Sequence, residues 1–144
     1  MARSFVYEVD IDNPVDQVWQ AITDPKRVAS WLMSNDLKPA VGHKFQFRSS
    51  AAAGSDGIVD CEVLEVTPNQ RLVYRWVGGP LMETTVTWEL APAGQGTHVK
   101  MTHGGFNVMK WGFVSLFLGS RWKKLDRVYV ESLRDLLNKG ALRN

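Results

Sequence analysis

The sequence predicts one α+β domain in which a curved antiparallel sheet of about six to seven strands wraps on a long C-terminal helix. Three observations support this fold class. Alternating apolar and polar residues, typical of half-buried strands, begin the chain and fill its middle. Two short helical segments follow the first strand, and apolar residues recur every three or four positions in the last third. The 144 residues suffice for a single domain, 1–144, with a buried core.

The first strand is predicted over residues 5–11, where apolar residues occupy every second position. Asn13-Pro14 and Asp24-Pro25 follow it, and each pair places a helix-capping residue before a proline. We therefore expect two short helices in tandem. Asn13 and Asp24 are expected to cap their free backbone donors.

The middle of the chain predicts an antiparallel meander. After a short strand, Phe45–Arg48, the expected strands are Ile58–Val66, Leu72–Val77, Glu83–Leu90 and Thr97–His103, separated by turns rich in glycine, proline and asparagine. Alternation places one set of bulky side chains on a common concave face: Tyr74, Trp76, Val86, Trp88, Leu90, Val99, Met101 and His103.

The last third predicts the long helix, which Gly140 would terminate. Its apolar stripe consists of Leu118, Trp122, Leu125, Tyr129, Leu133 and Leu136. The segment before it, Phe106–Leu118, is unusually apolar but too short to cross a bilayer, which takes about 20 apolar residues. Three interpretations stay open for it: a lid over a cavity, a homodimer surface, or peripheral contact with a membrane. The side chains concerned are Phe106, Met109, Trp111, Phe113 and Phe117.

An ordered set of short motifs resembles the START-like superfamily (helix-grip, SRPBCC), within the branch similar to the heat-shock protein 90 ATPase activator homologue-like domain. The motifs are Asp12–Trp19, Thr23–Pro25 with Trp31-Leu32, Thr67-Pro68 with Arg71–Trp76, Gly96-Thr97, Thr102–Phe106, and a leucine-rich helix, Gly119–Leu137. The resemblance covers nearly the whole chain and implies a helix-grip fold with an internal pocket. Members of this superfamily bind lipids, polyketides, hormones or protein partners, and some catalyse cyclisation.

The expected pocket lies between the long helix and the concave face of the sheet. The side chains predicted to line it are Trp31, Phe47, Tyr74, Trp76, Val86, Trp88, Met101, His103, Trp122, Leu125 and Tyr129. Large aromatic residues build either a heavy core or the wall of a ligand pocket, so the six tryptophans fit both interpretations. His103 is either a polar anchor for the ligand or a hydrogen-bonded structural histidine.

Other chemistry is not indicated by the sequence. The three histidines and Cys61 show no zinc spacing, so we expect no metal and no cofactor. A buried, structural role is expected for Cys61, and a lone cysteine with no apolar leader predicts a cytoplasmic protein. Basic residues gather after residue 120, but with too few interleaved aromatics to indicate nucleic-acid binding. No transmembrane segment is expected.

Three functional hypotheses remain at this point. The first is a protein that binds an apolar small molecule in an internal cavity, without catalysis. The second is a chaperone-linked or other adaptor that binds a protein partner through its surface and the apolar segment. The third is an enzyme of cyclase or hydrolase type, for which Tyr74, Arg48 and His103 are the candidate acids and bases.

Overall fold

A computed structural model describes residues 2–48, 58–77, 83–107 and 127–138. Its elements in chain order are β1 (Ala2–Ile11), α1 (Val15–Thr23), α2 (Pro25–Trp31), β2 (Ser34–Asn35), β3 (Lys44–Arg48), β4 (Ile58–Thr67), β5 (Arg71–Val77), β6 (Glu83–Ala93), β7 (Gly96–Asn107) and a C-terminal helix at 127–138. The two short helices and the meander confirm the predicted α+β fold. The two-residue strand β2 was not predicted.

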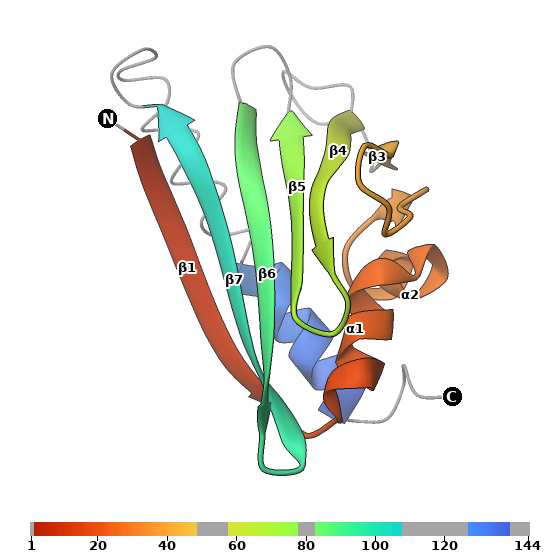
Figure 1. Cartoon of the computed structure of the whole chain (residues 1–144), viewed down its shortest axis with the longest axis vertical. Coiled ribbons are helices and arrows are strands. Elements are labelled where there is room, and N and C mark those ends of the chain that lie inside the picture. The colour runs from red at the N-terminus through yellow and green to blue at the C-terminus, as the bar shows by residue number, and fades with distance from the viewer. Residues whose placement is uncertain (1, 49–57, 78–82, 108–126, 139–144) are drawn as a thin grey trace.

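The strands of the described residues form one antiparallel sheet in the order β1-β7-β6-β5-β4-β3-β2. Each hairpin connects neighbours, and β7 returns to pair with β1 along its length. Figure 1 shows a curved sheet with the C-terminal helix, in blue, behind it and with α1 and α2 on the side of β4. Register shifts at Arg3/Ser4 and Val63/Glu65 interrupt the pairing. Such bulges bend a strand and increase its twist, which helps the sheet curl around the helix.

The helix starts differ in part from the sequence prediction. Pro25 takes the first position of α2, as expected, but neither α1 nor α2 has a side-chain cap. The capping role of Asn13 is therefore wrong: its amide donates to Gln17 Oε1 at 2.8 Å, and its carbonyl oxygen accepts from Thr97 Oγ1 at 2.7 Å. Asn13 is fully buried, so it joins the start of α1 to β7. Asp24 occupies the N-cap position of α2, as predicted, but its side chain makes no capping hydrogen bond and its carboxylate lies 3.8 Å from Arg27 Nε instead.

Gly96 allows β7 to begin close against the end of β1. A Cβ atom at this position would overlap the carbonyl oxygen of Ile11. Because that obstacle is backbone, it cannot move aside as a flexible side chain would. Glycine therefore fixes the corner where β6, β7 and the end of β1 meet.

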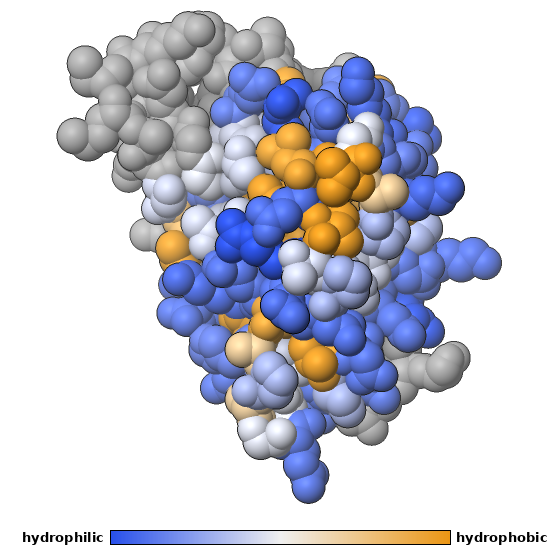
Figure 2. Space-filling view, in the orientation of Figure 1, coloured by the Kyte–Doolittle hydropathy of each residue, from blue (hydrophilic) through white to orange (hydrophobic). Residues whose placement is uncertain are grey.

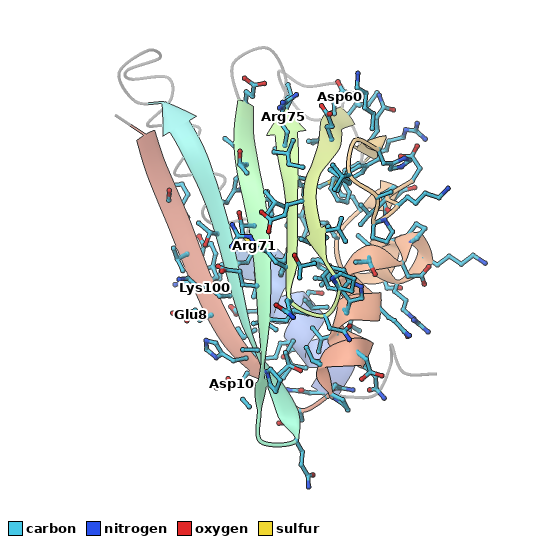
Figure 3. The ribbon with its side chains drawn as sticks, in the orientation of Figure 1. Glu8, Asp10, Asp60, Arg71, Arg75 and Lys100 are labelled. Atoms are coloured by element: carbon cyan, nitrogen blue, oxygen red, sulfur yellow. The ribbon has the colours of Figure 1, made fainter. Side chains whose placement is uncertain are left out.

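The outer face of the sheet carries charged side chains in cross-strand pairs (Figure 3). Arg71 lies 2.9 Å from Glu65 and 3.0 Å from Glu89, measured between side-chain nitrogen and oxygen atoms. The His98 ring is held by Glu8 at 2.9 Å and Asp10 at 2.8 Å. Figure 2 shows this face as mainly hydrophilic, with an apolar patch in its upper half. The exposed pairs keep this face solvated and favour the observed register.

The inner face is apolar and aromatic, as the period-two pattern predicts. The concave set named from the sequence is buried, including Tyr74, Trp76, Trp88 and Met101. The C-terminal helix packs against this core through Val130, Leu133 and Leu137, whereas Tyr129 and Leu136 of the predicted stripe are only partly buried. At its far end, Asn138 accepts a hydrogen bond from the backbone nitrogen of Asp12 at 2.9 Å. The predicted helix residues Leu118, Trp122 and Leu125 lie outside the described residues.

Candidate functional site

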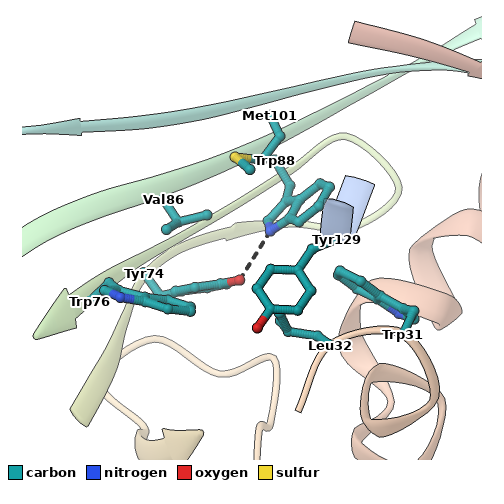
Figure 4. A pocket seen from close by; sticks show the side chains of 8 residues that line it. All are labelled: Trp31, Leu32, Tyr74, Trp76, Val86, Trp88, Met101 and Tyr129. Atoms are coloured by element: carbon teal, nitrogen blue, oxygen red, sulfur yellow. Dashed lines mark hydrogen bonds between the residues drawn. The ribbon is translucent and has the colours of Figure 1, made fainter. Parts of the chain in front are cut away.

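A cavity lies between the inner face of the sheet and the helices (Figure 4). One wall comes from the sheet: Tyr74 and Trp76 of β5, Val86 and Trp88 of β6, and Met101 of β7. These side chains converge because their positions alternate inward and because Tyr74 is opposite Val86 and Trp88 is opposite Met101. The other wall comes from Trp31 and Leu32 at the end of α2 and from Tyr129 of the C-terminal helix.

The rings around the cavity hold one another in fixed orientations. Trp31 packs edge-on against Trp88, with 5.5 Å between the ring centroids. The Trp31 indole nitrogen donates to the Ala21 carbonyl oxygen at 2.8 Å, and the Trp88 indole nitrogen donates to the Tyr74 hydroxyl at 3.0 Å. Buried indole and phenol groups normally have such partners, since an unpaired polar group in an apolar interior is costly. Trp88 and Tyr74 on the sheet side and Trp31 on the helix side are thus held in fixed orientations.

The cavity is small. Its volume open to the centre of a water molecule is ≈ 20 Å³, which is close to the space that one water needs. Pockets that enclose small molecules measure roughly 300–1,000 Å³. Leu32 and Tyr129 are only partly buried, whereas the other lining side chains are buried. An occupant larger than water therefore requires movement, and these two side chains form the rim where movement costs least.

The predicted lining residues fall into three groups. Trp31, Tyr74, Trp76, Val86, Trp88, Met101 and Tyr129 surround the cavity. Phe47 and His103 are buried in the same core but are not among the described side chains that line this cavity. Trp122 and Leu125 lie outside the described residues, as do Met109, Trp111, Phe113 and Phe117 and the side chain of Phe106. Leu32 lines the cavity but was not predicted to do so, although it directly follows the predicted lining residue Trp31 in the sequence.

Phe47 and His103 are buried and contact the aromatic wall at Trp76. Phe47 is fully buried, with its ring centroid 5.1 Å from that of Trp76. The His103 ring packs edge-on against Trp76 at 5.6 Å, and its Nε2 lies 2.7 Å from Thr84 Oγ1. The Thr84 hydroxyl also donates to the Trp76 carbonyl oxygen at 3.2 Å, so it accepts from His103 Nε2. These contacts hold Trp76 in place.

The three candidate acids and bases do not come together. Arg48 is exposed and donates to Gln46 Oε1 at 2.8 Å on the outer side of β3, whose inward residues are Phe45 and Phe47. Tyr74 and His103 are buried on the inner side. Because the sheet separates Arg48 from the other two, the expected trio is wrong as an active-site set.

Metal and thiol chemistry also receive no support from the described part of the chain. It holds no group of three or more His, Cys, Asp or Glu side chains placed to bind a metal ion. Burial is the main cause that raises the pKa of the Cys61 thiol, and the negative charges of Asp60 and Asp36 add to it. A thiol of this kind is a poor nucleophile. None of the helices over the described residues is long and apolar enough to cross a membrane.

Comparison with known proteins gives a consistent result. The family model described as Activator of Hsp90 ATPase homolog 1-like protein matches residues 12–111. No curated protein matches the chain. Among solved structures, protein MLL2253 from Mesorhizobium loti is 35% identical, with a TM-score of 0.83 over 95% of this chain and 98% of that one. Protein BH1534 of Bacillus halodurans is 27% identical, with a TM-score of 0.75 over 94% and 96% of the two chains.

A more distant structure shares the fold alone. The Aha1 dimer from Colwellia psychrerythraea is 19% identical to this chain, with a TM-score of 0.74 over 94% of this chain and 96% of that one.

Proposed function

The chain belongs to the family of Activator of Hsp90 ATPase homolog 1-like proteins, and we propose that it is a binding protein that takes an apolar small molecule into the cavity beneath Leu32 and Tyr129. The observation that carries this proposal is the composition of the cavity wall. Aromatic and aliphatic side chains from three strands and two helices meet there, and the rim is the only partly exposed part of the lining among the described residues. Apolar, concave sites of this kind are the usual location of small-molecule binding.

Binding requires the rim to open, because the resting volume of ≈ 20 Å³ is too small for an organic molecule. Tyr129 is the better candidate for the moving group. It projects from a helix toward the sheet wall (Figure 4), and rotation about its first two side-chain torsions would transfer its ring volume to the cavity. The sheet wall would stay in place because the Trp88 indole of β6 is hydrogen-bonded to the Tyr74 hydroxyl of β5.

A fluorescence titration with N-phenyl-1-naphthylamine, a neutral apolar probe, tests the proposal. We expect saturable binding to the wild type and tighter binding to Tyr129→Ala, which opens the rim permanently. Leu32→Trp should weaken binding, because a larger side chain blocks the same rim. Val128→Ala, at an exposed neighbouring position of the helix, is the matched control and should bind like the wild type.

Thermal unfolding gives an independent measure of the same binding. A ligand at about 100 times its Kd stabilises the folded state by roughly 2.7 kcal/mol, which for a domain of this size raises Tm by about 8 °C. Absence of binding to both the wild type and Tyr129→Ala, or equal binding by Leu32→Trp and the wild type, would refute the proposal.

A protein partner is the second candidate, and the small resting cavity favours it. A packed interior needs no ligand, and the distantly related Aha1 was solved as a dimer. Under this hypothesis the apolar segment Phe106–Leu118 contacts a partner or a second copy of the chain. Light scattering of the purified protein would then show a dimer that Trp111→Asp and Phe113→Asp dissociate. A monomer at all concentrations, in the wild type and both variants, would count against a homodimer.

A further inference from the structure

Most of the described side chains that line the cavity are tryptophan or tyrosine: Trp31, Tyr74, Trp76, Trp88 and Tyr129. Their rings lie in different planes. Trp31 and Trp88 make an interplanar angle of 81°, whereas Tyr74 and Trp76 are nearly parallel, at 24°. Figure 4 shows Trp76 and Trp31 at opposite sides of the group, with the rings of Trp88 and Tyr129 between them. A group that enters the cavity would therefore meet aromatic rings from several directions.

These rings offer more than apolar surface. The face of an aromatic ring carries partial negative charge and attracts a cation within about 6 Å of the ring centre, and tryptophan does so most strongly. Phenylalanine would suffice for a purely apolar wall. Phe45 and Phe47 pack against Tyr74, yet neither is among the described side chains that line the cavity. The wall is thus built from the ring types that are best suited to hold a positive charge.

The rest of the lining indicates which kind of cation fits. It consists of Leu32, Val86 and Met101, so no described side chain of the lining carries a charge. A primary ammonium has three N–H donors and would lose their hydrogen bonds to water here, with no carboxylate of the described lining to replace them. A quaternary ammonium has no N–H donor. Its alkyl groups pack like other apolar groups, and its charge needs only the ring faces.

We propose that the cavity binds a quaternary ammonium group carried by an otherwise apolar ligand, and that the rings of Trp31, Trp76 and Trp88 stabilise its positive charge. This inference rests on the proposed small-molecule function and narrows the class of ligand. Attraction to the rings replaces part of the hydration that the cation loses on entry. The Tyr129 ring, after turning aside to admit the group, would close over it as a further aromatic surface.

Matched probes isolate the charge. Benzyltrimethylammonium and neopentylbenzene have the same shape, but the first has a positively charged nitrogen where the second has a carbon. In calorimetric titrations we expect the wild type to bind the cation about tenfold more tightly than the hydrocarbon. Benzylammonium should bind about tenfold more weakly than benzyltrimethylammonium, because its N–H donors lose their partners. In Tyr129→Leu, which removes one ring, the preference for the cation should fall to about threefold. Leu32→Val is the matched control and should keep the wild-type preference.

Fluorinated protein keeps the test independent of how well the variants fold. Incorporation of 5-fluorotryptophan withdraws electron density from the ring faces with little change in shape. The preference for the cation should then fall about threefold, while affinity for neopentylbenzene stays within about twofold. Equal or tighter binding of neopentylbenzene by the wild type, equal binding of benzylammonium, or a cation preference that survives fluorination would overturn the inference and leave the binding function standing. Failure of N-phenyl-1-naphthylamine and all three probes to bind the wild type and Tyr129→Ala would overturn the binding function itself.

Discussion

Replacing Leu133 with alanine measures how firmly the C-terminal helix is held against the sheet. The Leu133 side chain is 0% exposed and belongs to the main core, together with Val130 and Leu137 of the same helix. Removing its outer carbons loses their transfer free energy and leaves a cavity that the ordered aromatic wall cannot fill. Leu→Ala changes at fully buried sites cost about 3–5 kcal/mol. For a domain of this size we expect Tm to fall by about 9–15 °C.

Urea unfolding followed by tryptophan fluorescence and circular dichroism gives this free energy directly. The matched control is Val128→Ala on the same helix, whose side chain is 59% exposed. Its effect should stay within about 0.5 kcal/mol. A loss below about 1 kcal/mol for Leu133→Ala, or equal losses for the two variants, would show that this helix is not part of the core, and the cavity would lose its second wall.

Two further predictions concern titratable groups. Hydrogen bonds to Glu8 and Asp10 raise the pKa of the His98 ring above its ordinary value of 6.5. The folded state thus favours the charged ring, so its stabilising effect should be fully present below pH 6.5 and lost as pH rises through the folded-state pKa. Unfolding across this range should show the loss in the wild type but not in His98→Gln; parallel curves would contradict it. Burial raises the pKa of the Cys61 thiol, so Ellman's reagent at pH 8 should react only as the protein unfolds. Rapid labelling in native buffer would contradict this.

The elements with strong periodicity could be predicted from the sequence because local pattern and final environment agree. The strands from β4 to β7 expose one face to water and bury the other, so their alternation survives in the structure as Tyr74, Trp76 and Trp88 on one side and Arg75 on the other. Pro25 likewise takes the first position of α2, because a helix tolerates the fixed backbone angle and the missing N–H of proline there. These features depend on residues close together in the chain.

Features that depend on distant contacts could not be predicted in the same way. Alternation correctly predicts that Phe47 faces inward, but it does not tell which inward side chains line the cavity, and Phe47 packs against Tyr74 and Trp76 without lining it. Asn13 is a residue type favoured at helix caps, yet its side chain donates to Gln17 and its backbone carbonyl accepts from Thr97, far along the chain. Strand β2 has only two residues, so it has no period to detect. The cavity volume depends on how several side chains pack together.

The energetics of the two walls indicate how the cavity would open. Moving the C-terminal helix away from the sheet would expose Val130, Leu133 and Leu137, all fully or almost fully buried. Each such exposure costs about 1.5–3 kcal/mol, so helix displacement would require about 5 kcal/mol or more. Rotating the partly exposed Tyr129 ring displaces one side chain at the rim and exposes less apolar surface than moving the helix. The binding free energy of a micromolar ligand, about 8 kcal/mol, is what remains after the cost of opening, so ring rotation reduces the affinity less than helix displacement would. The cavity can therefore open by rotation of the Tyr129 ring while the helix stays in place. Leu133→Ala should then destabilise the fold without changing which ligands can pass the rim formed by Tyr129 and Leu32.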